Sequence, residues 1–148
     1  MPTGILISLV LLFAPIVGGM LIGVFGKKMK GGGDVIGIAA LCTSLACAIA
    51  LFLGFGSADN PGYGGAHWEF TWLTVGVVDW NLGITIDGLT VALLMVVTVV
   101  SCVVHFFSKG YMHGDDRYSD FFRWLGLFTF SMLGLVLSDN LLTLFIFW

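Results

Sequence analysis

Four long runs of apolar residues dominate this chain of 148 residues and limit the folds open to it. They cover about residues 5–25, 35–55, 88–112 and 121–137. A membrane-spanning helix needs about 17–25 consecutive, mainly apolar residues, so each run is long enough to cross a bilayer. Helices satisfy their backbone hydrogen bonds internally, as a bilayer requires. We therefore expect an all-α integral membrane protein with four complete transmembrane helices.

A fifth apolar run begins at Leu141 and reaches Trp148. Eight helical residues rise only about 12 Å, whereas the hydrocarbon core of a bilayer is about 30 Å thick. We expect this run to be the start of a fifth helix, completed by another polypeptide or by a continuation of the chain. Residues 1–148 are expected to form a single membrane segment, without a soluble domain.

The composition argues against soluble and nucleic-acid-binding proteins. Apolar residues make up 58% of the chain and charged residues 10%, whereas soluble domains average about 45–50% and about 25%. Six scattered Lys and Arg residues are too few to follow a phosphate backbone, so we expect no nucleic-acid partner. The three cysteines lie in apolar runs without a metal or redox spacing.

A polar connection joins the second and third apolar runs, and its second half alternates between apolar and polar residues. Such alternation indicates β-strands, and we predict an extracytoplasmic β-hairpin over about residues 68–87. The segment 79–81 separates the two alternating runs. Their apolar residues are Phe70 and Trp72 in the first run and Leu82, Ile84 and Ile86 in the second.

The basic residues are distributed unevenly along the chain. None falls between Gly31 and Ser108, so the hairpin connection contains no Lys or Arg. The positive-inside rule places basic turns in the cytoplasm, which puts the N-terminus and the hairpin outside. This arrangement fits a bacterial plasma membrane, and a thylakoid or organelle membrane is the alternative. The six basic residues are Lys27, Lys28, Lys30, Lys109, Arg117 and Arg123.

Ionisable residues inside a span are candidates for function by default. His105 lies about two turns before the end of the third apolar run, and an imidazole, which ordinarily titrates near pH 6.5, suits a proton relay. The alternative is a histidine hydrogen-bonded to a neighbouring helix. Lys109 follows four residues later on the same helical face. It is either a relay partner or a side chain that reaches the headgroups.

Three further polar residues lie at the ends of apolar runs. Asp139 either caps the fifth helix or sits at the outer mouth of a proton path. Asp87 and Ser119 are placed to cap the third and fourth helices, a role typical of these residue types. His67 and His113 have no partners at metal-ligand spacing, and no cofactor or catalytic motif is present, so we expect neither a metal nor a cofactor in this chain.

Three stretches carry a resemblance to a known family. They read "ITIDGLTVALL", "VVHFFSKGYMHGDDRYSDFF" and "LFTFSMLGLVLSDNLLTLFIFW". Together they resemble the N-terminal region of the antiporter-like subunit L (chain 5) of proton-pumping NADH:quinone oxidoreductase, respiratory complex I. The chain is also similar to the A subunit of Mrp cation/proton antiporters in its "DGL" and "SDN…FW" signatures.

The resemblance implies a membrane-arm subunit that contributes to proton translocation coupled to electron transfer elsewhere in the complex. NADH, FMN, iron–sulfur clusters and quinone would then bind to other subunits, and the partners would be other membrane-arm subunits and lipids. In this family, a glutamate follows the position of Trp148 and lysines on later helices complete the proton path. The alternatives are an Mrp-type antiporter subunit and a membrane segment that only packs against partners.

Overall fold

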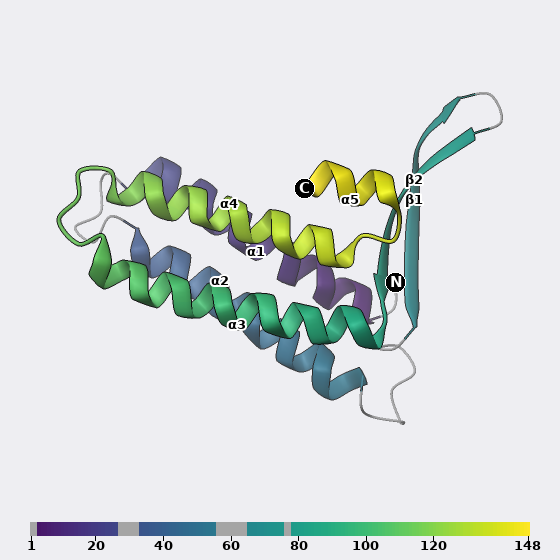
Figure 1. Ribbon diagram of the computed structural model, residues 1–148, viewed down its shortest axis with the longest axis horizontal. Coiled ribbons are helices and arrows are strands. Elements are labelled where there is room, and N and C mark those ends of the chain that lie inside the picture. The colour runs from purple at the N-terminus through teal and green to yellow at the C-terminus, as the bar shows by residue number, and fades with distance from the viewer. Residues whose placement is uncertain (1–2, 27–32, 56–64, 76–77) are drawn as a thin grey trace.

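A computed structural model describes residues 3–26, 33–55, 65–75 and 78–148. In these ranges, four long helices lie side by side, with a β-hairpin and a short fifth helix at one end of the bundle (Figure 1). The elements are α1 (Thr3–Phe25), α2 (Asp34–Phe55), β1 (Ala66–Val75), β2 (Val78–Ile86), α3 (Gly88–Tyr111), α4 (Tyr118–Leu137) and α5 (Leu141–Phe147).

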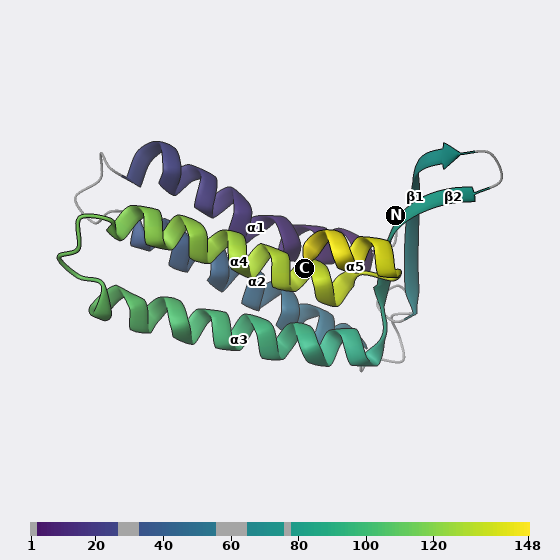
Figure 2. The same ribbon diagram turned by 45° about the horizontal axis from the view of Figure 1, so that its top comes forward.

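Each helix from α1 to α4 is long and apolar enough to cross a membrane, which confirms the prediction of four spans and a mainly helical fold. The chain order places the end of α1, the start of α2, the end of α3 and the start of α4 together, and we call this the turn end. The hairpin and α5 lie at the opposite end, the hairpin end (Figure 2). Large apolar side chains such as Leu53 and Phe107 are exposed on the outer faces of the helices, as contact with lipid requires.

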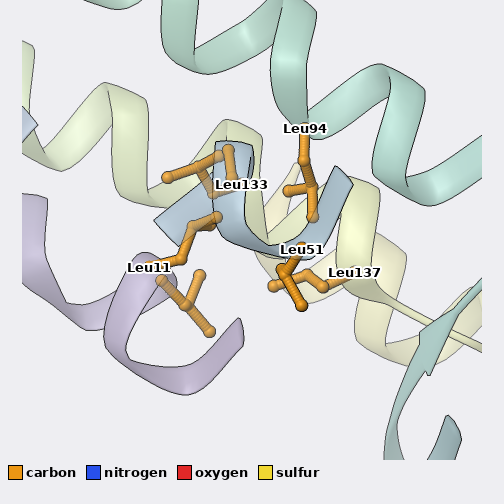
Figure 3. Close-up of a cluster of buried hydrophobic side chains, with 7 residues drawn as sticks. Leu11, Leu51, Leu94, Leu133 and Leu137 are labelled. Atoms are coloured by element: carbon orange, nitrogen blue, oxygen red, sulfur yellow. The ribbon is translucent and has the colours of Figure 1, made fainter. Parts of the chain in front are cut away.

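A cluster of buried leucines and one alanine holds the hairpin-end half of the bundle together. Its side chains come from all four long helices and point toward one another (Figure 3). The shared feature is an aliphatic side chain without a polar atom, so the cluster itself is entirely apolar. The members are Leu11, Leu12, Ala48, Leu51, Leu94, Leu133 and Leu137.

Pro15 lies inside α1 and determines one contact between α1 and α2. Proline has no backbone N–H, so the carbonyl four residues earlier, at Leu11, loses its helical donor. The hydroxyl of Ser44 on α2 donates a hydrogen bond to this carbonyl at 3.0 Å, and both residues are fully buried. A freed carbonyl inside a membrane needs such a partner, so Pro15 and Ser44 together fix the relation of the two helices.

Small residues allow α1 to approach both of its neighbours closely. A Cβ added to Gly18 would lie 2.6 Å from Cβ of Ala40 on α2, and a Cβ added to Gly126 on α4 would lie 2.9 Å from the carbonyl oxygen of Pro15. Close backbone approach through small residues is the usual way in which helices associate in membranes. Glycine at these positions therefore sets the spacing of α1 against α2 and α4.

The hairpin is present, but its turn is not in the segment 79–81. This segment pairs with β1 as part of β2, and the strands remain paired as far as Val75 and Val78, with residues 76–77 outside the described ranges. The irregularity between Thr71 and Leu73 leaves Trp72 as an extra residue in β1. Such a bulge shifts the alternation by one position, which makes a continuous strand look interrupted in the sequence.

The structure has the predicted N-cap residue in α3 and a different one in α4. Asp87 occupies the N-cap of α3, and its carboxylate accepts a hydrogen bond from the backbone N–H of Thr90 at 2.6 Å. Hydrogen bonding to Thr90 holds the pKa of Asp87 below its ordinary value. The prediction for Ser119 is wrong: α4 begins at Tyr118, and Arg117 is the N-cap residue, without a side-chain cap bond. Ser119 lies inside the first turn because the helix extends past the apolar run.

Candidate functional site

His105 is buried at the turn end, six residues before Tyr111, the last residue of α3. Its side chain is only 1% exposed, and Nδ1 lies 2.9 Å from the backbone carbonyl oxygen of Ser101. A carbonyl can only accept, so Nδ1 carries the hydrogen, and in the neutral imidazole Nε2 is the acceptor. Nε2 is buried and has no partner among the described residues. His105 therefore presents an unsatisfied basic nitrogen to the interior.

The surroundings of His105 come from α2 and α4. The ring of Phe122 on α4 meets the imidazole edge-on, with 5.8 Å between ring centroids. On α2, a Cβ added to Gly37 would lie 3.8 Å from Cδ2 of the imidazole. The imidazole thus lies between an aromatic ring and a helix surface without a side chain.

Lys109 pairs with a residue that the sequence reasoning missed. Its Nζ lies 3.1 Å from Oδ2 of Asp34, whose side chain is 6% exposed, whereas the side chain of Lys109 is 51% exposed. Asp34 is the first residue of α2, and its position in a glycine-rich connection beside three lysines gave no sign of burial. The one available signal was an acid directly before an apolar run, in an otherwise basic connection.

The two helices α2 and α3 bring these residues together in two layers. Lys109 and His105 are four residues apart on α3, and Asp34 and Gly37 are three residues apart on α2, so each pair shares one helical face. Lys109 meets Asp34 close to the surface, and His105 meets Gly37 one turn deeper. We call Asp34, His105 and Lys109 the turn-end cluster.

Asp139 belongs to a second group of polar residues at the hairpin end. Its Oδ2 lies 2.9 Å from Nε2 of His67 in β1, and its side chain is 12% exposed against 48% for His67. Oδ1 of Asp139 is buried without a partner among the described residues. Gly83 of β2 lies so close to this carboxylate that no side chain would fit there.

The capping role expected as one alternative for Asp139 is wrong. The N-cap of α5 is Asn140, whose side-chain oxygen accepts from the backbone N–H of Thr143 at 2.8 Å. The side-chain amide of Asn140 also donates to the backbone carbonyl of Asn81 at 2.7 Å. Asn140 thus joins the hairpin to the start of α5 and leaves Asp139 free to face His67.

The two groups of polar residues lie at opposite ends of the bundle, and the leucine cluster lies on the path between them. Buried hydroxyls occur in this region, but each donates to a backbone carbonyl: Ser44 to Leu11, Thr98 to Leu94 and Thr129 to Leu125. The described helices therefore offer polar groups at each end without a continuous polar route between them. Among the described residues, no group of three or more His, Cys, Asp or Glu side chains could hold a metal ion.

Comparison with known proteins supports the family resemblance. The model of a family described as the N-terminus of chain 5 of NADH-ubiquinone oxidoreductase (complex I) matches residues 72–122. NADH-quinone oxidoreductase subunit L of Neisseria meningitidis serogroup A is 34% identical over 142 residues, which is 95% of this chain and 21% of the relative. By sequence, the chain is similar to the N-terminal part of complex I chain 5 proteins along nearly all of its length.

Other proteins similar to this chain carry related names. NADH-ubiquinone oxidoreductase chain 5 of Phytophthora infestans is 35% identical over 97% of the chain and 21% of the relative. The chloroplastic NAD(P)H-quinone oxidoreductase subunit 5 of Anthoceros angustus is 37% identical over 90% of the chain and 19% of the relative. The chain spans about a fifth of the length of these relatives. With four span-capable helices, it is an integral membrane protein.

Proposed function

We propose that this chain is the N-terminal part of a membrane-arm subunit of proton-translocating NADH:quinone oxidoreductase. The relatives that match along nearly all of the chain are named as subunits of this complex. In this proposal the chain takes part in proton movement while NADH, FMN, iron–sulfur clusters and quinone bind to other subunits. Its partners are the other membrane-arm subunits, the polypeptide that continues α5, and lipids.

The observation that carries the proposal is the buried imidazole of His105. It is fixed through Nδ1 to Ser101 and leaves Nε2 without a partner among the described residues. A histidine in this arrangement is able to take a proton on Nε2 and release it without breaking the hydrogen bond that orients the ring. We assign His105 and Lys109 to the proton path at one side of the membrane and Asp139 to the other side.

The proposed orientation follows from charge. Lys109, Arg117 and Arg123 lie at the turn end, and the described strands of the hairpin carry no Lys or Arg. The positive-inside rule supports a cytoplasmic turn end and an outer hairpin end with the N-terminus. We place the protein in the bacterial plasma membrane, a choice that the bacterial relative supports.

The test uses the complete complex in inverted membrane vesicles. NADH-driven acidification of the vesicles is measured with a pH-sensitive dye, alongside electron transfer from NADH to an artificial acceptor. We expect His105→Gln to lower the protons moved per NADH severalfold and to leave electron transfer to the acceptor unchanged. His113→Gln is the matched control, because His113 lies exposed in the connection after α3.

Three results would contradict the proposal. If the purified chain carries no redox subunit with it, it does not belong to the oxidoreductase. If proton movement depends on sodium and not on NADH, the chain is an antiporter subunit of the Mrp type. If His105→Gln and Asp139→Asn both leave pumping intact while loss of the chain disassembles the complex, its role is packing.

A further inference from the structure

A groove lies between α1 and α4, which run side by side along the bundle (Figure 2), and the proposed proton path does not use it. Its volume is about 390 Å³. The groove is open to the outside of the bundle, since Met20 of α1 and Trp124 of α4 are each more than half exposed. Arg123 is the one charged residue among the six that line it. The six are Ile16, Gly19, Met20, Arg123, Trp124 and Leu127.

A second hollow, of about 440 Å³, lies at the turn end and shares Arg123 and Trp124 with the groove. Its lining carries two acids and two bases, so it has a charged character that the groove lacks. Together the two hollows form an apolar slot with a charged mouth. A phospholipid has the same two parts in its acyl chains and its headgroup. The charged residues of the second hollow are Asp115, Arg117, Asp120 and Arg123.

The level of Arg123 in the bundle fits the border between lipid headgroups and acyl chains. Arg123 is the sixth residue of α4, which begins at Tyr118, so it lies about 8 Å along the helix at a rise of about 1.5 Å per residue. Its neighbour Trp124 is exposed, and tryptophan side chains are enriched at this level of a bilayer. Leu127 lies one turn deeper, so the groove continues into the part of the helix that acyl chains surround.

Three neighbours hold the side chain of Arg123 at the mouth of the groove. Its Cζ lies 5.0 Å from the centre of the Trp124 ring, and its Cδ lies 3.1 Å from where a Cβ on Gly23 of α1 would be. Its Nη2 lies 3.8 Å from Oδ1 of Asp120, within the range of an ion pair but too far for a hydrogen bond. The two side chains are 41% and 39% exposed, so both keep hydrogen-bonding groups available to a ligand.

Asp120 is better placed than Asp115 to meet a headgroup. Oδ1 of Asp115 already accepts a hydrogen bond from the backbone N–H of Arg117 at 2.7 Å, which holds this carboxylate within its own turn. Asp120 instead lies beside Arg123, so an acid and a base stand next to each other where the two hollows meet. Such a pair is complementary to a headgroup that carries a phosphate and an ammonium group close together.

We propose that the groove and the second hollow bind a phospholipid with a primary amine in its headgroup, of the phosphatidylethanolamine type. Its phosphate accepts hydrogen bonds from the guanidinium group of Arg123, whose fork of donors matches phosphate oxygens. Its ammonium group donates to the carboxylate of Asp120, and one acyl chain lies in the groove. A choline headgroup has no N–H to donate, and a glycerol headgroup has no positive charge for Asp120. The site follows from the membrane location of the chain and is independent of its proposed part in proton translocation.

The test uses the protein purified in its native assembly and reconstituted into liposomes with a trace of photoactivatable phospholipid. The reactive group is placed on an acyl chain, so that probes with ethanolamine, choline and glycerol headgroups are compared with the headgroup unchanged. Mass spectrometry identifies the labelled peptides. We expect the ethanolamine probe to label the segments around Met20 and Leu127 severalfold more than the other two probes do.

Two variants and a matched control assign the preference to the proposed contacts. We expect Arg123→Gln to lower labelling by the ethanolamine probe about tenfold, the size of effect that loss of one hydrogen bond between charged groups produces. Asp120→Asn should reduce this labelling to the level of the choline probe, because the amine loses its acceptor. Asp116→Asn is the control, since Asp116 is exposed in the same connection and lines neither hollow. If Arg123→Gln does not assemble, the result for Asp120→Asn decides.

Three outcomes would overturn the inference. Equal labelling by the three probes would mean that the groove holds only the ordinary lipid shell. Preference for the glycerol probe would mean that an anionic headgroup binds without Asp120. Absence of labelling would mean that another helix of the assembly covers the groove. If the vesicles show no NADH-driven acidification, the proposed function fails, but the labelling pattern still decides whether this lipid site exists.

Discussion

The hydrogen bond from Ser44 to the carbonyl of Leu11 offers a sharp test of how the first two helices are held together. The carbonyl lacks a helical donor because residue 15 is proline, and Ser44 supplies the donor from α2 at 3.0 Å. In Ser44→Ala, the carbonyl stays buried without a partner. We expect the variant to be less stable than the wild type by an amount that depends on residue 15.

The expected loss of stability in Ser44→Ala follows from two known ranges of hydrogen-bond free energy. Leaving a buried polar group without its partner costs about 1–3 kcal/mol in proteins generally. Side-chain hydrogen bonds between membrane helices average about 0.6 kcal/mol and reach about 1.7 kcal/mol. The carbonyl of Leu11 has no substitute donor inside its own helix, so the cost should lie in the upper part of the membrane range. We expect Ser44→Ala to lower the free energy of unfolding by about 1–2 kcal/mol.

Pro15→Ala should make the stability of the protein independent of the hydroxyl of Ser44. The backbone N–H of an alanine at position 15 is able to donate to Leu11 along the helix, so the hydroxyl of Ser44 is no longer the only donor. In this background we expect Ser44→Ala to cost less than about 0.5 kcal/mol, which gives a coupling energy of about 1 kcal/mol in the double-mutant cycle. The free energy of unfolding would be measured by SDS titration in mixed micelles, with helicity followed by circular dichroism.

Thr43→Ala is the matched control for this cycle. Thr43 is the neighbouring residue on α2, but its hydroxyl is exposed and donates to the carbonyl of Ala39 within the same helix. Ala39 keeps its backbone donor, so we expect a change within about 0.5 kcal/mol, as for other surface substitutions. An equal cost of Ser44→Ala with proline and with alanine at position 15 would refute the reasoning, because the freed carbonyl would then not be the cause.

Three further predictions concern a cap, a helix contact and the hairpin. Asp87→Ala should lower the free energy of unfolding by about 1 kcal/mol at neutral pH. Because the pKa of Asp87 is lowered from 3.8, this stabilisation is present above pH 3.8 and is lost as the pH falls below it. SDS titration at several pH values would check this. Gly126→Val should lower the free energy of unfolding by about 1–3 kcal/mol, because the larger side chain overpacks α4 against α1. Gly110→Ala is the control and should not destabilise the protein, because a Cβ there meets nothing within 4 Å. Gly83→Ala should push the hairpin away from Asp139 and speed hydrogen exchange in β2 while leaving α2 unchanged.

The helices could be predicted because their signal is local. Length and apolar composition define a span without knowledge of its neighbours, and the second and third predicted spans agree with α2 and α3 to within one residue at each end. The start of α4 was placed three residues late, at 121 instead of Tyr118. Polar residues in the first turn of a membrane helix do not belong to its apolar run, so composition alone misses them.

The partners of the candidate site residues could not be predicted in this way. His105, Lys109 and Asp139 stand out because they are ionisable residues in or beside apolar runs. Their neighbours Asp34 and His67 lie on other elements, and His67 is 72 positions away from Asp139. Which helix faces meet depends on small residues such as Gly18 and Gly126, and the sequence does not state which neighbour each of them contacts. The pairs follow from tertiary packing, which one sequence without a structure does not give.

The distribution of polar groups indicates what these four helices contribute to a proton path. The turn end offers the ion pair of Asp34 and Lys109 with His105 beneath it, and the hairpin end offers Asp139. Between them the core is aliphatic, and its hydroxyls donate to backbone carbonyls. A proton needs a chain of groups that both accept and donate, and the described residues of this core do not form one. If the proposed function holds, the crossing must be provided by helices that pack beside this bundle, and the described residues serve as its two ends. Substitutions in the leucine cluster should then change stability without changing the protons moved per NADH, whereas substitutions of His105 or Asp139 should lower the protons moved per NADH.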